Sequence, residues 1–269
     1  MARRPIVPLE ETHRSSGTEA AARVADVLLL FTRGPASLGV SAIARELGLS
    51  KAVVHRILQS LASRQVVELH PDGHGYQLGR AAVALGARAM RDLDLRRAAR
   101  PVLRRLREET QETTSLSELL GTARVYLDQF EGPQEVKVVL ELGRPHQLHA
   151  GGSGKVILAF LPAETRERIL AGSLEHVTPK TVTDPGALRA ELEEIAKAGY
   201  AGSIGERQRG VGSVAAPVFG MDGDVLGAVS VCGPTERFDA QAIEEHAPKV
   251  RKAAEEVSKA LGWTGPVSS

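Results

Sequence analysis

The chain has 269 residues, of which 42% are hydrophobic and 25% are charged, and its formal net charge is +1. That length exceeds what one small domain needs, so two domains are expected. The sequence has no run of about 18 uninterrupted apolar residues, which excludes a membrane-spanning helix. Its arginine-containing start lacks the apolar region of a signal peptide. Cys232 is the only cysteine, so no internal disulfide can form, and we expect a cytoplasmic protein.

The near-neutral total conceals two halves of opposite charge. Residues 1–107 hold 18 Lys and Arg against 9 Asp and Glu, whereas residues 108–269 hold 16 against 24. A basic half joined to an acidic half indicates that one part binds an anionic polymer and the other does not. A solvated arginine-rich helix would give the same imbalance. Eight arginines lie between Arg88 and Arg107, and we expect most of them to face water.

The first elements are predicted to be a tail and a helix. Residues 1–17 contain Pro, Ser and Arg without a hydrophobic period, and we expect them to be disordered. The segment TEAAARVADVLLLFTRG then predicts a helix with Thr18 as its N-cap and Gly34 as its stop.

The next two predicted helices are separated by a tight turn. A short helix begins at Ser41 and closes at Gly48, and a third helix follows Ser50 as its N-cap. The interval 46–51 contains glycine and is as short as the turn of a helix-turn-helix. After the third helix, VVELHPDGHGYQLG predicts two short strands about a turn at residues 71–73. Residues 18–80 are therefore predicted to be a winged helix-turn-helix.

The third helix, LSKAVVHRILQSL, has two different faces. Its apolar stripe, spaced i, i+3, i+4 and i+7, consists of Val54, Ile57, Leu58 and Leu61. The opposite face carries long donors that can reach bases or phosphates in a DNA major groove. We expect DNA contacts from the third helix by Ser50, Lys51, Ala52, Val53, His55, Arg56 and Gln59. His70 and His74 in the wing, and Arg80 after it, could lie against phosphate or the minor groove.

These DNA-binding candidates have different expected roles. Lys51, Arg56 and Gln59 are the best candidates for base or phosphate contacts, because their donors reach furthest. Ala52 and Val53 could at most touch a thymine methyl group. His74 is equally consistent with a plain turn residue of the wing.

Residues 80–97 predict a connecting helix, and residues 98–111 predict the first helix of a second domain, because Pro101 breaks or restarts a helix. Strands and helices then alternate. Strand-like runs occupy 114–131 and 135–142, short helices lie around 154–161 and 162–172, and a longer helix over 184–199 starts at Asp184. A hairpin of buried strands about residues 221–223 and a terminal helix over 239–262 follow. The predicted fold class is α+β, with an antiparallel sheet flanked by helices.

Five segments carry a resemblance to a known family: SAIARELGLSKAVVHRILQSL, GHGYQLG, LHAGGSGKVILAFLP, GYAGSIGERQRGVGSVAAPVF and GAVSVCGPTERF. Together they resemble the IclR family of bacterial transcriptional regulators over residues 18–262. The resemblance implies a DNA-binding domain at 18–80, a linker helix at 81–97, a GAF-like effector-binding domain at 98–262 and a tail at 263–269. It also implies a homodimer, or a dimer of dimers, on a pseudo-palindromic double-stranded operator.

One departure concerns the reading helix. The family commonly has a Ser-Thr pair where this chain has Ala52 and Val53, so the DNA sequences preferred by relatives do not transfer.

The segment GGSGK at 151–155 is not a nucleotide-binding phosphate loop. That motif needs Gly six residues before the lysine and Ser or Thr after it, but His149 and Val156 hold those places. What remains is a glycine-rich loop entering a helix, whose free N–H groups and dipole favour an anion such as a carboxylate. A tight structural turn would need the same glycines, so both interpretations stay open.

In relatives the effector pocket is built from this loop, the strand before it and the last hairpin. Carried onto this chain, the resemblance implies effector contacts by Val138, Gly152, Ser153, Gly154, Ser203, Val211, Ser213, Ser230 and Cys232. Ser230 and Cys232 lie two apart on a strand and so share a face. Ser203 stands where some relatives carry an acidic residue, and Ser213 replaces a cysteine. Small buried hydroxyls can bind a ligand, and they are also ordinary satisfied groups in a core.

No nucleophile elbow, Cys–His signature, paired carboxylates or metal-ligand spacing occurs in the sequence. We therefore expect no enzyme activity, metal or cofactor. The predicted function is a sequence-specific transcriptional regulator, with repression as the expected mode, that binds operator DNA and a small carboxylic acid effector, and has no membrane partner. The alternative is a cytosolic small-molecule-binding protein without direct DNA contact.

Overall fold

The computed structural model describes residues 18–32, 35–92 and 94–265, and the chain divides into two compact units between residues 93 and 94. The tail expected at 1–17 and the stop expected at Gly34 lie outside the described residues. None of the described helices is long and apolar enough to span a membrane.

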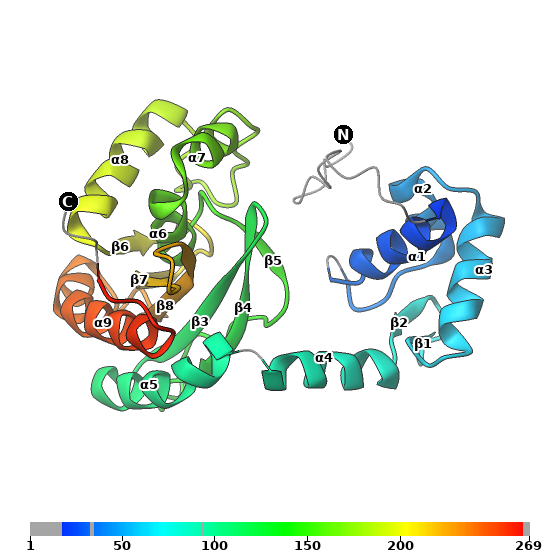
Figure 1. The fold of residues 1–269 in the computed structure, drawn as a ribbon, viewed down its shortest axis with the longest axis horizontal. Coiled ribbons are helices and arrows are strands. Elements are labelled where there is room, and N and C mark those ends of the chain that lie inside the picture. Colours follow the sequence, from blue (N-terminus) through cyan, green and yellow to red (C-terminus); the bar gives the residue numbers. More distant parts are fainter. Residues whose placement is uncertain (1–17, 33–34, 93, 266–269) are drawn as a thin grey trace. The chain divides into compact units, whose positions relative to one another are not determined.

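The N-terminal unit is a winged helix-turn-helix, as the sequence predicts (Figure 1). Its elements are α1 Glu19–Leu30, α2 Val40–Leu47, α3 Lys51–Ala62, β1 Val67–Leu69, β2 Tyr76–Leu78 and α4 Arg80–Asp92. Strands β1 and β2 pair antiparallel to form the wing.

Local signals set the ends of the N-terminal helices. The Thr18 hydroxyl accepts from the N–H of Ala21, and the Ser50 hydroxyl accepts from the N–H of Val53, which satisfies donors that helix starts leave free. Gly48 closes α2 at φ 65°, a left-handed conformation that glycine adopts without steric cost. The unit has its own apolar core, formed by Val27, Ile43, Ala44, Val54, Leu58, Leu61 and Val67. The apolar stripe of α3 thus packs inward, and its polar face is left outside.

The helix break expected at Pro101 is wrong. Helix α4 ends at Asp92 and α5 runs Asp94–Thr110, so the boundary expected between helices at 80–97 and 98–111 is also wrong. Pro101 lies exposed inside α5. Proline removes one backbone hydrogen bond from a helix, but α5 buries one complete face, whose packing offsets that loss. The buried residues of this face are Leu95, Ala99, Val102, Leu103, Leu106 and Thr110.

Several arginines of α5 contact the sheet, although the sequence predicted that most would face water. Arg96 and Arg100 lie 2.9 and 3.2 Å from the carboxylate of Asp128, which is only 8% exposed. The guanidinium groups of Arg100 and Arg104 lie 5.3 and 5.5 Å from the ring centroid of Phe130. Three of the arginines counted in the basic half therefore hold α5 against the sheet.

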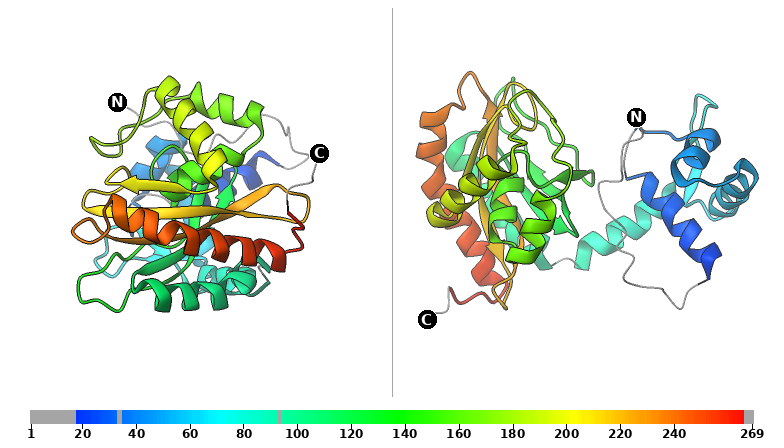
Figure 2. Two further views of the ribbon diagram at one scale, coloured as in Figure 1. Left: turned by 90° about the vertical axis from the view of Figure 1, so that its left-hand side faces the viewer. Right: turned by 90° about the horizontal axis from the view of Figure 1, so that it is seen from above.

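The C-terminal unit is a six-stranded antiparallel sheet with the order β5-β4-β3-β8-β7-β6. Its strands are β3 Thr113–Leu120, β4 Ala123–Phe130, β5 Pro145–Gln147, β6 Ala201–Ile204, β7 Val211–Phe219 and β8 Val225–Pro234. Its remaining helices are α6 Gly152–Phe160, α7 Ala163–Leu170, α8 Pro185–Ala198 and α9 Ala240–Ala260. Helices α5 and α9 cover one face, and α6 and α8 cover the other (Figure 2, left). The expected α+β class is confirmed.

The strand predicted at 135–142 is wrong, because this segment lies against the sheet without a backbone ladder. The side-chain amide of Gln129 takes the place of a strand: its Nε2 donates to the carbonyl of Leu140 at 2.8 Å, and its Oε1 accepts from the N–H of Leu140 at 2.9 Å. The Thr113 hydroxyl donates to the carbonyl of Val138 at 2.7 Å. Only Val138 and Leu140 of the alternating apolar residues are buried, whereas Val136 and Leu142 are exposed. Side chains, rather than a neighbouring strand, bond to the backbone of Val138 and Leu140.

The end of the chain is partly packed where a tail was expected from residue 263. The ring of Trp263 stacks on Phe219 at 5.1 Å between centroids, and the backbone N–H of Trp263 donates to the carbonyl of Ser258 at 3.0 Å. The rest of the expected tail, residues 266–269, lies outside the described residues.

Candidate DNA-binding face and effector pocket

The face of α3 that the sequence predicts for DNA is exposed. Its exposed residues are Lys51, Ala52, His55, Arg56 and Gln59, while Val53 is half-buried. Within the described part of the chain, the side chains of Lys51, Arg56 and Gln59 make no hydrogen bond or ion pair. Two cations and an amide held on a rigid helix without internal partners are free to bind an external polyanion.

The wing histidines have different surroundings. The carboxylate of Asp72 lies 2.8 Å from Nδ1 of His70 and accepts from the N–H of His74 at 2.8 Å. These bonds, first that from His74 and then that to His70, lower the pKa of Asp72. His70 and Asp72 thus shape the turn, whereas the side chain of His74 is exposed. Arg80, also predicted to bind DNA, is exposed at the start of α4.

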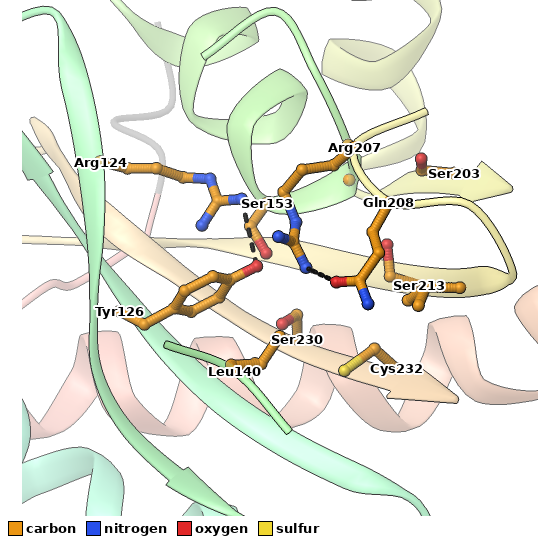
Figure 3. Close-up of a pocket in the computed structure, with 13 residues that line it drawn as sticks. Arg124, Tyr126, Leu140, Ser153, Ser203, Arg207, Gln208, Ser213, Ser230 and Cys232 are labelled. Carbon is orange, nitrogen blue, oxygen red and sulfur yellow. Dashed lines mark hydrogen bonds between the residues drawn. The ribbon is translucent and has the colours of Figure 1, made fainter. Parts of the chain in front are cut away.

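The C-terminal unit contains a pocket between the N-terminus of α6 and the sheet (Figure 3). It encloses about 350 Å³ of space outside atoms, part of which is open to solvent. Seven of the nine predicted effector contacts line it: Gly152, Ser153, Ser203, Val211, Ser213, Ser230 and Cys232. The hydroxyl of Ser230 is already bonded to that of Ser115 at 2.8 Å, so it is partly satisfied within the sheet.

Two predicted effector contacts do not line the pocket. Val138 is 5% exposed and packs in an apolar cluster with Tyr126, Leu140 and Cys232, so it supports the wall. Gly154 lies against the carbonyl of Leu148, where a Cβ would come within 2.5 Å. Position 154 is therefore glycine because α6 packs closely against the backbone of Leu148.

The pocket also has lining residues that the sequence did not predict, namely Arg124, Tyr126, Leu140, Gly151, Arg207 and Gln208. Arg124 is 1% exposed, and its guanidinium group donates to the hydroxyls of Ser117 and Tyr126, both at 3.1 Å. A charged residue within the apolar run ARVYLDQF, two positions from Tyr126 and so on the same face, was the available signal.

The glycine-rich loop starts α6 at the pocket. Gly151 has φ 83°, a left-handed conformation, and a Cβ on Gly152 would lie 2.8 Å from the carbonyl oxygen of Ala201. Among the described residues, the N–H groups of Gly152 and Ser153 have no acceptor. Free amides at a helix start, together with its dipole, favour an anion there.

The lysine of GGSGK does not serve the pocket. Lys155 is completely buried, and its Nζ donates to Oε1 of Glu206 at 2.6 Å and to the carboxylate of Glu191. The other oxygen of Glu206 accepts from the N–H of Gly151 at 3.4 Å. These ion pairs hold the loop beside the pocket.

Two titratable groups at or near the pocket, His146 and the thiol of Cys232, are neutral at pH 7. Burial, then the charges of Arg124, Arg207 and Arg144, lowers the pKa of His146 to about 3. Burial raises the pKa of the Cys232 thiol to about 12. A protonated thiol is a poor nucleophile. Among the described residues, no group of three or more His, Cys, Asp or Glu could hold a metal ion.

A winged helix with an outward donor face, followed by a second domain, is typical of a DNA-binding transcriptional regulator. The sequence profile of the IclR helix-turn-helix domain matches residues 20–71, and that of the bacterial transcriptional regulator IclR C-terminal domain matches residues 87–259. The chain belongs to the IclR family, which consists of transcriptional regulators and not of enzymes.

Similar proteins extend over nearly the whole chain. The HTH-type transcriptional regulator BhcR of Paracoccus denitrificans is 36% identical over 91% of this chain and 88% of its own. A crystal structure of an IclR regulator from Silicibacter sp. TM1040 is 33% identical, with a TM-score of 0.83, and the match covers 92% and 98% of the two chains. The crystal structure of an IclR homologue from Microbacterium hydrocarbonoxydans in complex with 4-hydroxybenzoate is 29% identical, with a TM-score of 0.75. The match covers 90% of this chain and 99% of that chain.

Proposed function

We propose that this protein is a sequence-specific regulator, acting as a repressor, whose operator binding responds to a small carboxylic acid in the pocket of the C-terminal unit. Residues 18–80 bind DNA, residues 81–97 link the domains, and residues 98–262 bind the effector. The observation that carries the proposal is the outward face of α3, whose long donors have no partners within the described chain.

The DNA contacts fall on this face. Lys51, Arg56 and Gln59 reach bases or phosphates, and the other contacts are made by Ser50, Ala52, Val53, His55, His70, His74 and Arg80. The test is a gel-shift titration of the full chain with the DNA upstream of its gene, using Lys51→Ala and Arg56→Ala. Losing a phosphate contact should reduce the salt slope by about 1, and losing a base contact should relax specificity by about 1–3 kcal/mol.

The matched control is Lys197→Ala, which removes one exposed lysine charge far along the sequence from α3. It should bind the operator as the wild type does. Unchanged operator affinity in both α3 variants, with normal circular dichroism, would contradict the assignment of the reading helix. A ligand-binding protein without DNA contact, the rival function, would give no specific shift in any variant.

The regulator acts as a homodimer, or a dimer of dimers, joined through residues 18–97. In α4, Val83 and Leu85 are 68% and 66% exposed, and large apolar side chains in such positions are typical of an association surface. A dimer suits operator half-sites one helical turn, or a multiple of it, apart. Effector binding then shifts the balance between two dimer arrangements, to the extent that its affinities for them differ.

The effector carboxylate docks near the free amides of Gly152 and Ser153, with Ser213, Ser230 and Cys232 beneath it. The complex of a relative with 4-hydroxybenzoate supports a small acid. Ser153 is 3% exposed, so Ser153→Trp should fill the pocket. The variant should lose the thermal shift caused by the acid, and its operator binding should become insensitive to the acid. A retained thermal shift in a correctly folded variant would place the effector elsewhere.

A further inference from the structure

Two guanidinium groups share the pocket without a carboxylate partner. Arg124 is bonded only to neutral hydroxyls, and its Nε has no partner. The guanidinium carbon of Arg207 lies 5.6 Å from the ring centroid of Tyr126, and that of Arg124 lies 4.5 Å from the same centroid. Figure 3 shows the two groups on either side of the Ser153 hydroxyl, with Gln208 accepting from Arg207 at 3.4 Å.

Two carboxylates near these arginines, in sequence or in space, are bonded to other cations. Glu206, next to Arg207 in the sequence, pairs with Lys155. Glu112 binds Arg237 through both oxygens, at 2.5 and 3.1 Å. Neither guanidinium group of the pocket wall therefore forms an ion pair with a described residue. Arg124 is 1% exposed, and a buried charge without an ion-pair partner costs free energy.

We infer that the pocket selects a dianion, a small molecule with two acidic groups, one received by Arg124 and the Tyr126 hydroxyl and the other by Arg207 beside the α6 amides. This inference rests on the effector pocket proposed above and specifies the ligand class. It makes Arg124 and Arg207 the residues that determine specificity.

A single carboxylate would pair with one guanidinium group and leave the other, either the buried Arg124 or the half-buried Arg207, without a counter-ion. The neighbouring groups cannot supply the missing negative charge, because the thiol of Cys232 is protonated at neutral pH. Burial lowers the pKa of Arg124, Tyr126 offsets part of this effect and Arg207 adds to it, so the surroundings of Arg124 disfavour the charge that a dianion would stabilise. Each guanidinium can hold a carboxylate through two parallel hydrogen bonds, which favours planar acids.

The test uses the full chain and matched ligand pairs. Saturated dicarboxylates of two to six carbons and the three benzene dicarboxylates are compared by calorimetry with their half-amides, which keep the shape but lose one charge. At least one diacid should bind ten-fold or more tightly than its half-amide. That ratio should fall to about one in Arg124→Met and Arg207→Met, and it should persist in Arg144→Met, whose side chain is half-exposed and does not line the pocket.

Equal affinity for a diacid and its half-amide would overturn the inference, as would failure of every diacid to bind the wild type. The melting temperature of the unliganded protein gives a readout that does not depend on the ligand chosen. Arg124→Met should raise it or leave it unchanged, because the variant removes an uncompensated charge. A clear drop would show a structural role and would contradict the inference.

Failure of this inference is distinguishable from failure of the proposed function. Operator binding without any acid tests the regulator by itself. If monocarboxylates bind with full affinity and modulate the operator complex, the function stands and the dianion preference is wrong.

Discussion

His146 shows what one buried side chain should do to the stability of the protein. Its pKa in the folded chain is about 3, against an ordinary value of 6.5, first because of burial and then because of three nearby arginines. Between these values the unfolded chain binds the proton and the folded chain does not. The stabilisation is therefore complete above the ordinary value and is lost as the pH falls, by up to about 1.4 kcal/mol per pH unit.

The measurement is urea unfolding of the wild type and His146→Gln at pH 8, 6.5 and 5. Between pH 6.5 and 5 the wild type should lose about 1–2 kcal/mol more than the variant does. Equal losses would mean that His146 does not contribute to the acid sensitivity. The values at pH 8 serve as the reference, because the imidazole is neutral there in both states.

Some residues of the pocket could be predicted from the sequence and others could not. Its small polar members follow from the family motifs, whereas Arg124 and Arg207 were missed. An arginine in a strand or loop is normally exposed. The spacing of Arg124 from Tyr126 indicates that they share a face of a strand, but whether an arginine is buried there depends on strands and a helix that are distant in sequence.

At the scale of elements, the ion pairs of Lys155 should stabilise the start of α6. Lys155→Met leaves Glu206, whose side chain is 12% exposed, without its cation. Breaking such a pair from one side costs about 3–5 kcal/mol of unfolding free energy. Adding Glu206→Gln to Lys155→Met should restore part of the lost unfolding free energy, because it removes the unpaired carboxylate. Lys197→Met, at an exposed pair with Glu194, is the control and should have little effect in the same denaturation experiment. If Lys155→Met alone is as stable as the wild type, the ion pairs of Lys155 do not stabilise the fold.

Helices were predicted better than strands. Caps are local signals: Ser50 and Asp184 start α3 and α8 where the sequence placed them. Strand pairing is not local. The apolar alternation at 135–142 fits a strand, but Gln129 satisfies that backbone instead, while the unpredicted β5, Pro145–Gln147, pairs with β4. Likewise, the buried face of α5 outweighs the local signal of Pro101.

At the scale of the whole molecule, DNA binding and acid sensing should be separable. The N-terminal unit has its own core, so residues 1–80 should fold alone. We expect this fragment to bind operator DNA weakly, since it lacks the linker that supports dimerisation, and to ignore the acid. Fluorescence anisotropy with labelled operator DNA checks both points. A fragment that responds to the acid as the full chain does would contradict the proposed location of the effector pocket.

The most direct test of the account is the operator Kd of the full chain, measured by anisotropy with and without a saturating acid that calorimetry shows to bind. If the pocket controls the reading helix, the acid should change this Kd by about 5- to 150-fold, the range of a 1–3 kcal/mol coupling. The change should be absent in Ser153→Trp. An acid that binds the pocket and leaves the operator Kd of the wild type unaltered would contradict the account.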